Sequence, residues 1–271
     1  MTEGEQYVLG YREAEQERLQ RQAVELAHES SWLFDQLGPL DGARVLEIGC
    51  GPHGCLDQLS RRVGPAGSVV GVERSPEAVV LAKKMVASEG LTNVEVLARD
   101  ARSTGFPRAS FDLVTSRLLL VNIPRPEQVV SEAVALAKPD GWVAFHEADW
   151  VCHLCDPPLD AWTTIRDLFV RYARRNGIDS YIGRRVPRLL RDAGIVDVAI
   201  NPLVHVYPPG HARRSILLDF AENLSSRLVD DGLVSDIELT ELKARLGEHL
   251  AANDTLVVSH LFFQVWGQKA R

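Results

Sequence analysis

Apolar positions follow two spacings along the first half of the chain, one typical of β-strands and one typical of helices. Five short apolar runs have the length of β-strands, and they cover residues 43–48, 68–73, 94–99, 111–115 and 142–147. Helical segments lie between several of these runs, at about 54–63, 76–89 and 126–137. The helix at 76–89 has the clearest bounds, because Ser75 and Pro76 suit its start and Gly90 suits its end. Strands that alternate with helices predict a parallel sheet with helices on both faces.

The remaining segments predict more helix than strand. Residues 13–37 carry apolar side chains at helical spacing and predict an N-terminal helical segment, which Gly38-Pro39 ends. In the second half we expect helices at about 159–175 and 185–193, a strand at 195–206, two helices within 211–251 and a last strand from Thr255 to Gln268.

Composition narrows the class of protein. A chain of 271 residues suits one large α/β domain or two small ones, and its net charge of −7 argues against a nucleic-acid partner. An arginine-rich stretch at 171–191 reads as solvated helix faces. The chain has no run of 18 apolar residues and no leader-like start, so we expect no membrane partner. Four cysteines and no secretion signal favour a reducing, cytoplasmic location.

Acidic residues close three successive strand candidates. The first run ends as Val45-Leu46-Glu47-Ile48 and leads into Gly49-Cys50-Gly51-Pro52-His53-Gly54, while Glu73 and Asp100 close the next two runs. Glycines allow a ligand to approach the backbone, and a following helix offers free N–H groups. The glycine pattern alone also fits a dinucleotide cofactor. A carboxylate at Glu47 would repel a pyrophosphate, so the three acids fit a cationic, ribose-bearing cofactor better.

This order of motifs resembles the class I S-adenosylmethionine-dependent methyltransferases, most specifically over residues 40–148. The resemblance implies that Glu47 reaches the amino-acid end of the cofactor, that Glu73 accepts from the ribose hydroxyls, and that Asp100 with the Ala101 backbone meets the adenine. The loop backbone and the residues that follow the second and fourth strands would complete the site: Gly49, Cys50, Gly51, Arg74, Ser116 and Arg117. One departure is Pro52-His53, which separates Gly51 from Gly54 and lengthens the loop.

The N-terminal segment resembles that of the ubiquinone- and menaquinone-biosynthesis branch, in which Tyr7 and Gln22 would touch the methionine end of S-adenosylmethionine. A plain amphipathic helix explains the segment equally well. The implied fold is a Rossmann-like, seven-stranded, mostly parallel sheet with an antiparallel terminal strand. Residues 1–40 would form a helical cap, and the methyltransferase domain at 41–271 would carry helical lid elements at about 151–193 and 211–251.

Methyl transfer from a sulfonium is an in-line displacement, so the protein must mainly align the reactants and exclude water. His146 is the candidate base for an acceptor that needs one, although a hydrogen-bonded core histidine is the alternative. The expected substrate pocket comprises Trp150, Tyr181, Tyr11 and Asn122. The stretch Cys152-His153-Leu154-Cys155 lacks a second ligand pair, so we expect no metal site.

We therefore expect methyl transfer to a small aromatic or apolar metabolite, of the kind made in secondary metabolism such as antibiotic biosynthesis. The strand after residue 111 lacks an Asn/Asp-Pro-Pro-aromatic loop, which weighs against DNA-adenine and protein-glutamine substrates. The alternatives are a cofactor-binding fold that catalyses a cyclisation without methyl transfer, an NAD-dependent oxidoreductase and a non-catalytic scaffold. The sequence does not choose among O-, N- and C-methylation, and a homodimer is possible.

Overall fold

The computed structural model describes residues 13–271 and is built on one seven-stranded sheet in the order β3-β2-β1-β4-β5-β9-β7. The strands are β1 (Arg44–Ile48), β2 (Ser68–Glu73), β3 (Val94–Ala98), β4 (Phe111–Arg117), β5 (Ala137–Asp149), β7 (Ile195–Leu203) and β9 (Leu261–Lys269). Strands β3 to β5 pair in parallel, while β9 runs antiparallel to both β5 and β7. The predicted sheet with an antiparallel terminal strand is therefore confirmed.

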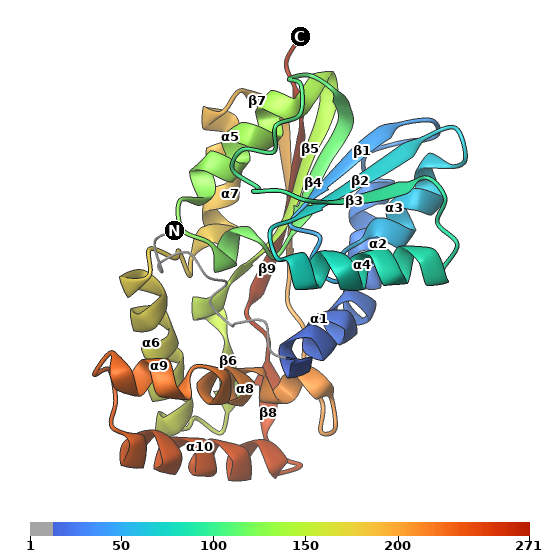
Figure 1. Cartoon of the computed structure of the whole chain (residues 1–271). Coiled ribbons are helices and arrows are strands. Elements are labelled where there is room, and N and C mark those ends of the chain that lie inside the picture. The colour runs from blue at the N-terminus through green and yellow to red at the C-terminus, as the bar shows by residue number, and fades with distance from the viewer. Residues whose placement is uncertain (1–12) are drawn as a thin grey trace.

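Helices cover both faces of the sheet (Figure 1). On one face α3 (Leu56–Val63) and α4 (Pro76–Ser88) pack on β1, β2 and β3. On the other, α5 (Pro126–Leu136) packs on β4 and β5, and α7 (Ile182–Asp192) packs on β5, β7 and β9. Part of the range 151–193 assigned to the lid thus belongs to the layer of helices that covers the sheet, because the apolar face of α7 is buried against these strands.

The N-terminal region is helical, as predicted for residues 13–37, and it is divided into two helices. Helix α1 (Glu13–Glu25) and α2 (Ala27–Asp35) meet at Leu26, whose φ of −94° and ψ of 10° leave helical geometry. The two helices have different neighbours: α2 packs beside the sheet, whereas α1 extends toward the helices that lie below the sheet in Figure 1.

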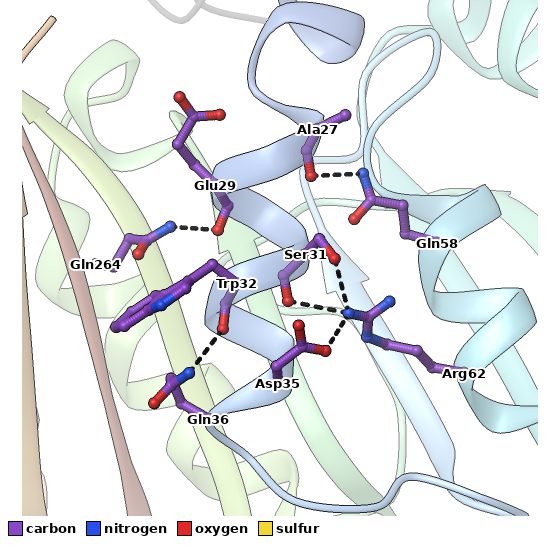
Figure 2. A network of polar contacts seen from close by, with 9 residues as sticks. All are labelled: Ala27, Glu29, Ser31, Trp32, Asp35, Gln36, Gln58, Arg62 and Gln264. Atoms are coloured by element: carbon purple, nitrogen blue, oxygen red, sulfur yellow. Dashed lines mark hydrogen bonds and ion pairs between the residues drawn. The ribbon is translucent and has the colours of Figure 1, made fainter.

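Helix α2 is fixed on both sides by side chains from α3 and β9 (Figure 2). The amide of Gln58 donates to the Ala27 carbonyl at 3.0 Å, and the Arg62 guanidinium donates to the Ser31 carbonyl at 2.9 Å. From the other side, Gln264 donates to the Glu29 carbonyl at 2.6 Å. These contacts hold α2 close to the glycine-rich loop that precedes α3.

The remaining elements form a group that we call the lid, beyond the carboxyl ends of the parallel strands (Figure 1). The lid comprises η2 (Trp150–Cys152), β6 (Leu154–Asp156), α6 (Asp160–Arg175), η3 (Ala212–Ser215), α8 (Ile216–Asn223), α9 (Ser225–Asp230), α10 (Asp236–Ala251) and β8 (Leu256–Val258). Helices α6, α8 and α10 pack on one another, and α10 buries leucines at helical spacing.

Two details of the lid differ from the prediction. Residues 211–251 form three α-helices and one 3₁₀ helix rather than two helices. The last strand is interrupted at Ser259-His260, because β8 leaves the main sheet and pairs antiparallel with β6. Arg214 holds this part of the lid together, since it is buried and donates to the backbone carbonyls of Tyr207, Leu250, Ala252 and Thr255 at 2.6–3.0 Å. Within residues 13–271, no helix combines the length and apolar character needed to cross a membrane.

Candidate cofactor and acceptor site

A cavity lies where the carboxyl ends of the parallel strands meet α1 and the lid. It is lined by most of the residues predicted for the cofactor and for the acceptor: Gln22, Glu47, Gly49, Cys50, Gly51, Glu73, Arg74, Asp100, Ala101, Arg117, Asn122 and Trp150. Arg18 and Leu19 of α1 also line the cavity, as do four residues that the sequence did not indicate: Arg213, Ile216 and Phe220 of the lid, and His260 between β8 and β9. Tyr7 and Tyr11 lie outside the described residues.

The glycine-rich loop wraps around the Glu47 carboxylate. Both oxygens of this buried carboxylate lie 2.9 Å from the Cys55 N–H at the start of α3. Gly54 has φ of +60°, and a Cβ at this position would lie 2.5 Å from Glu47 Oε2, so only glycine fits. Burial raises the pKa of Glu47 to about 7, against the opposing charge of Arg117. Glu47 therefore shapes the loop as well as lining the cavity.

Arg117 is held beside this loop at the end of β4. Its guanidinium donates to the Ser30 hydroxyl at 2.9 Å and to the Gly54 carbonyl at 3.0 Å. Its strand neighbour Ser116 is buried and does not line the cavity, because successive side chains of a strand point to opposite faces. The prediction that Ser116 contacts the cofactor is therefore not supported by its position.

Glu73 is oriented by two backbone donors at the end of β2. Its Oε1 accepts from the Ser75 N–H at 2.8 Å, and its Oε2 accepts from the Gly51 N–H at 3.2 Å. Each carboxylate oxygen has a second lone pair, so the group can still accept from two ligand hydroxyls. This is the geometry that a ribose with two neighbouring hydroxyls requires.

Asp100 lies in the cavity wall next to Glu73 and is paired with Arg102. The Arg102 guanidinium donates from Nε to Oδ1 at 3.0 Å and from Nη2 to Oδ2 at 2.7 Å. These hydrogen bonds lower the pKa of Asp100, so the side chain is an anionic acceptor at neutral pH. The pair places a fixed acceptor and several N–H donors at this end of the cavity.

The loop after β4 is fixed by Glu147, whose role the sequence did not reveal. The buried carboxylate accepts from the N–H groups of Leu119, Leu120 and Val121 at 2.9–3.2 Å, at the start of η1 (Leu120–Asn122). Burial raises the pKa of Glu147 to about 8 in spite of these donors. The arrangement presses Leu119 against the Cα of Gly49, where a Cβ would lie 2.8 Å from the leucine methyls.

The opposite end of the cavity is aromatic. Trp150 stacks on His260 with ring centroids 4.5 Å apart, and it meets Phe220 of α8 edge-on at 4.6 Å. Ile216 and Arg213, which precede Phe220 in η3 and α8, complete this wall. The predicted pocket residue Trp150 is therefore joined by three lid residues. Tyr181, in contrast, is 39% exposed at the start of α7 and does not line the cavity.

His146 does not line the cavity, which corrects its expected role as a base. Ala148 lines the cavity, and His146 lies two residues earlier on the same face of β5, so it lies deeper in the protein. Burial lowers its pKa to about 3, and neither ring nitrogen has a hydrogen-bond partner among the described residues. His146 is therefore a core histidine, as the alternative predicted, but it is not hydrogen-bonded to the described residues. His260 is the histidine that lines the cavity.

The Cys152-His153-Leu154-Cys155 stretch has a structural explanation. His153 is buried with its ring centroid 4.5 Å from that of Trp162, and both cysteines are free thiols. Over residues 13–271, no group of three or more His, Cys, Asp or Glu side chains could hold a metal ion.

Comparison with known proteins agrees with this geometry. A family model described as a methyltransferase domain matches residues 39–177, just over half of the chain. The chain therefore belongs to the class I S-adenosylmethionine-dependent methyltransferases. The match spans β1 to β5 and the start of the lid, which includes the glycine-rich loop and all three strand-end acids.

Individual relatives match this chain at low sequence identity and over part of its length. The chain is 30% identical to aklanonic acid methyltransferase DauC of a Streptomyces species over 46% of this chain and 64% of that protein. It is 34% identical to demethylmenaquinone methyltransferase of Lactococcus lactis over 40% of this chain and 43% of that protein. The chain spans about half the length of the curated relatives it matches. A phosphoethanolamine N-methyltransferase from Haemonchus contortus, solved with S-adenosylhomocysteine, shares the fold with a TM-score of 0.58 at 20% identity, covering 90% of this chain and 53% of that one.

Proposed function

We propose that the protein transfers the methyl group of S-adenosylmethionine to a small, apolar or aromatic acceptor by in-line displacement. The observation that carries the proposal is one cavity with two unlike ends. The end near β1 to β3 is polar, with three strand-end acids, arginines and loop backbone, and the end under the lid is aromatic. Family membership supports the cofactor and sets aside the NAD-dependent and scaffold alternatives.

The residues present fit this cofactor. Glu73 has free lone pairs for two ribose hydroxyls, and Asp100 is an anionic acceptor for the adenine amino group. Gly49 and Gly51 leave room for the backbone to approach the methionine part. When bound, S-adenosylmethionine supplies a methyl group already activated by positive sulfur. The chain's own contribution is to hold the acceptor against Trp150 and Phe220, exclude water and accept a proton where one is released.

We propose His260, in place of His146, as the group that accepts this proton, because it lines the cavity beside Trp150. Burial lowers its pKa, so the ring is neutral but only weakly basic at neutral pH; it would take the proton as the methyl group is transferred and would not retain it. We also propose a small-molecule acceptor, a cytoplasmic location and a homodimer; the last two rest on the sequence alone.

Isothermal titration with S-adenosylmethionine, S-adenosylhomocysteine and NAD tests the cofactor. We expect the two adenosyl compounds to bind and NAD not to bind. Glu73→Ala should weaken adenosyl binding by tenfold or more, since it removes charge-assisted hydrogen bonds of roughly 1.5–3 kcal/mol each. Glu95→Ala is the matched control, because this exposed acid of β3 does not line the cavity. Binding of NAD alone, or equal losses in both variants, would contradict the proposal, and adenosyl binding without methyl transfer to any acceptor would favour the cyclisation alternative.

A further inference from the structure

A buried guanidinium lies at the acceptor end of the cavity. Arg213 of η3 is 7% exposed and lines the cavity together with Trp150, Phe220 and His260. Its guanidinium lies over the ring of Phe262 at 5.3 Å from the centroid, which fixes its position. An arginine is rarely buried unless a partner offsets the loss of water around its charge.

The partners that the protein provides for Arg213 are incomplete. Glu25 of α1 is the acid paired with it, at 3.7 Å between Nε and Oε2, which is longer than a hydrogen bond. The Nη1 atom is buried and has no hydrogen-bond partner among the residues that the structure describes. The next residue, Arg214, is equally buried but donates to four backbone carbonyls. The fold therefore satisfies one of two neighbouring guanidiniums and leaves the other partly open to the cavity.

The histidines around Arg213 and the nearby Arg18 do not neutralise it. Burial, together with a smaller contribution from the charge of Arg213, lowers the pKa values of His146, His153, His205 and His260, so these rings are uncharged. Arg18 of α1 also lines the cavity, with its guanidinium 5.8 Å from the centroid of Phe220. Two arginines thus face the aromatic end, where no carboxylate of the described residues lines the cavity. Glu47, Glu73 and Asp100 lie at the strand end, together with Arg74, Arg99, Arg102 and Arg117.

We infer that the acceptor is a carboxylate-bearing aromatic compound, with its acid group bound by Arg213 and its ring packed against Trp150, Phe220 and Ile216. This inference rests on the proposed function and adds the class of substrate to it. A planar carboxylate matches the fork of a guanidinium, and the low polarity of the site strengthens the pair. Arg213 would bind the charged end of the acceptor, and its position does not determine which acceptor atom is methylated.

The test uses pairs of probes that differ only in charge: benzoate, naphthoate and anthracene carboxylate, each beside its neutral amide. Binding is measured by titration calorimetry on the whole protein, with and without S-adenosylhomocysteine. We expect at least one carboxylate to bind about tenfold or more tightly than its amide, as a charge-assisted pair predicts. Arg213→Gln should abolish this preference, and Arg213→Lys should retain part of it. The control Arg188→Gln removes an exposed arginine outside the cavity and should change nothing.

Glu25→Gln provides a variant with the opposite effect. It removes the acid that, among the described residues, forms an ion pair with Arg213, and it should tighten carboxylate binding by a few fold. The inference is overturned if no carboxylate is preferred to its amide. It is also overturned if Arg213→Gln weakens S-adenosylhomocysteine and leaves the preference intact, since Arg213 would then bind the cofactor's own carboxylate. Failure of the proposed function has a different signature, namely no adenosyl binding by the wild type while the carboxylate preference without cofactor persists.

Discussion

The two ends of the cavity differ in how completely the protein satisfies its own polar groups. At the strand end, Glu47, Glu73, Glu147 and Asp100 each accept hydrogen bonds from the backbone or from Arg102. At the lid end, Nη1 of Arg213 and Nδ1 of His260 are buried without hydrogen-bond partners among the described residues. A satisfied network is rigid before the ligand arrives, whereas open donors and acceptors cost free energy that a ligand can offset.

The largest effect should come from the rigid end, with Gly54→Ala. The new Cβ would lie 2.5 Å from Glu47 Oε2 and 2.9 Å from the Cys50 carbonyl, at a φ of +60° that disfavours alanine. We expect a loss of about 3 kcal/mol or more in the free energy of unfolding and a loss of adenosyl binding. Denaturant titration and calorimetry measure both. Gly42→Ala is the control, since φ is +71° there with nothing within 4 Å, and it should cost only about 1 kcal/mol and leave binding intact.

The neighbouring arginines provide the next test. Arg214→Gln leaves four backbone carbonyls without their donor and should destabilise the protein by about 3 kcal/mol. Arg213→Gln removes a buried charge whose pairing is incomplete, so its free energy of unfolding should change by less than about 1 kcal/mol. Denaturant unfolding of both variants decides the matter. Equal losses would show that Arg213 is as fully satisfied as Arg214, and the contrast between the two ends would be lost.

A smaller effect is expected in the dependence of stability on pH. His146, His153 and His260 have pKa values below 6.5 in the folded protein, so the unfolded chain binds more protons and stability should rise with pH up to about 6.5. The pKa values of Glu47 and Glu147 are raised to about 7 and about 8, so the folded protein binds more protons at these two carboxyls than the unfolded chain does. Above pH 6.5, where the histidines no longer contribute, the free energy of unfolding should therefore fall with pH until about pH 8. Stability should therefore be greatest between pH 6 and 7, as judged from these values.

Glu147→Gln tests how much of the loss of stability above pH 6.5 comes from Glu147. It removes one of the two raised carboxyls, so the fall above pH 6.5 should shrink by at most about 2 kcal/mol. The variant also weakens the start of η1, which lowers stability at every pH. A profile of unfolding free energy against pH separates the two effects. An unchanged slope between pH 6.5 and 8 would show that Glu147 is ionised in the folded protein.

The sequence predicted the strand end well and the lid end poorly, for physical reasons. Glu47, Glu73 and Asp100 follow short apolar runs, and parallel strands bring such ends to one edge of the sheet. Arg213 looks like any solvated arginine until the packing of η3 on Phe262 is known. The sequence placed His260 inside one continuous last strand. The break between β8 and β9 depends on the pairing of β8 with β6, which is distant in sequence, so the role of His260 was not predicted.

The smallest effect should come from the histidine that lies beneath the cavity. His146→Phe replaces two ring nitrogens that lack partners by carbon, and the ring keeps its edge-on contact with Phe262. We expect the free energy of unfolding to change by less than about 1 kcal/mol, and adenosyl and carboxylate affinities to change by less than about twofold. His260→Phe should weaken carboxylate binding more, because its ring forms part of the wall with Trp150. If His146→Phe proves equally damaging in calorimetry, the cavity extends deeper than Ala148, and His146 returns as a candidate base.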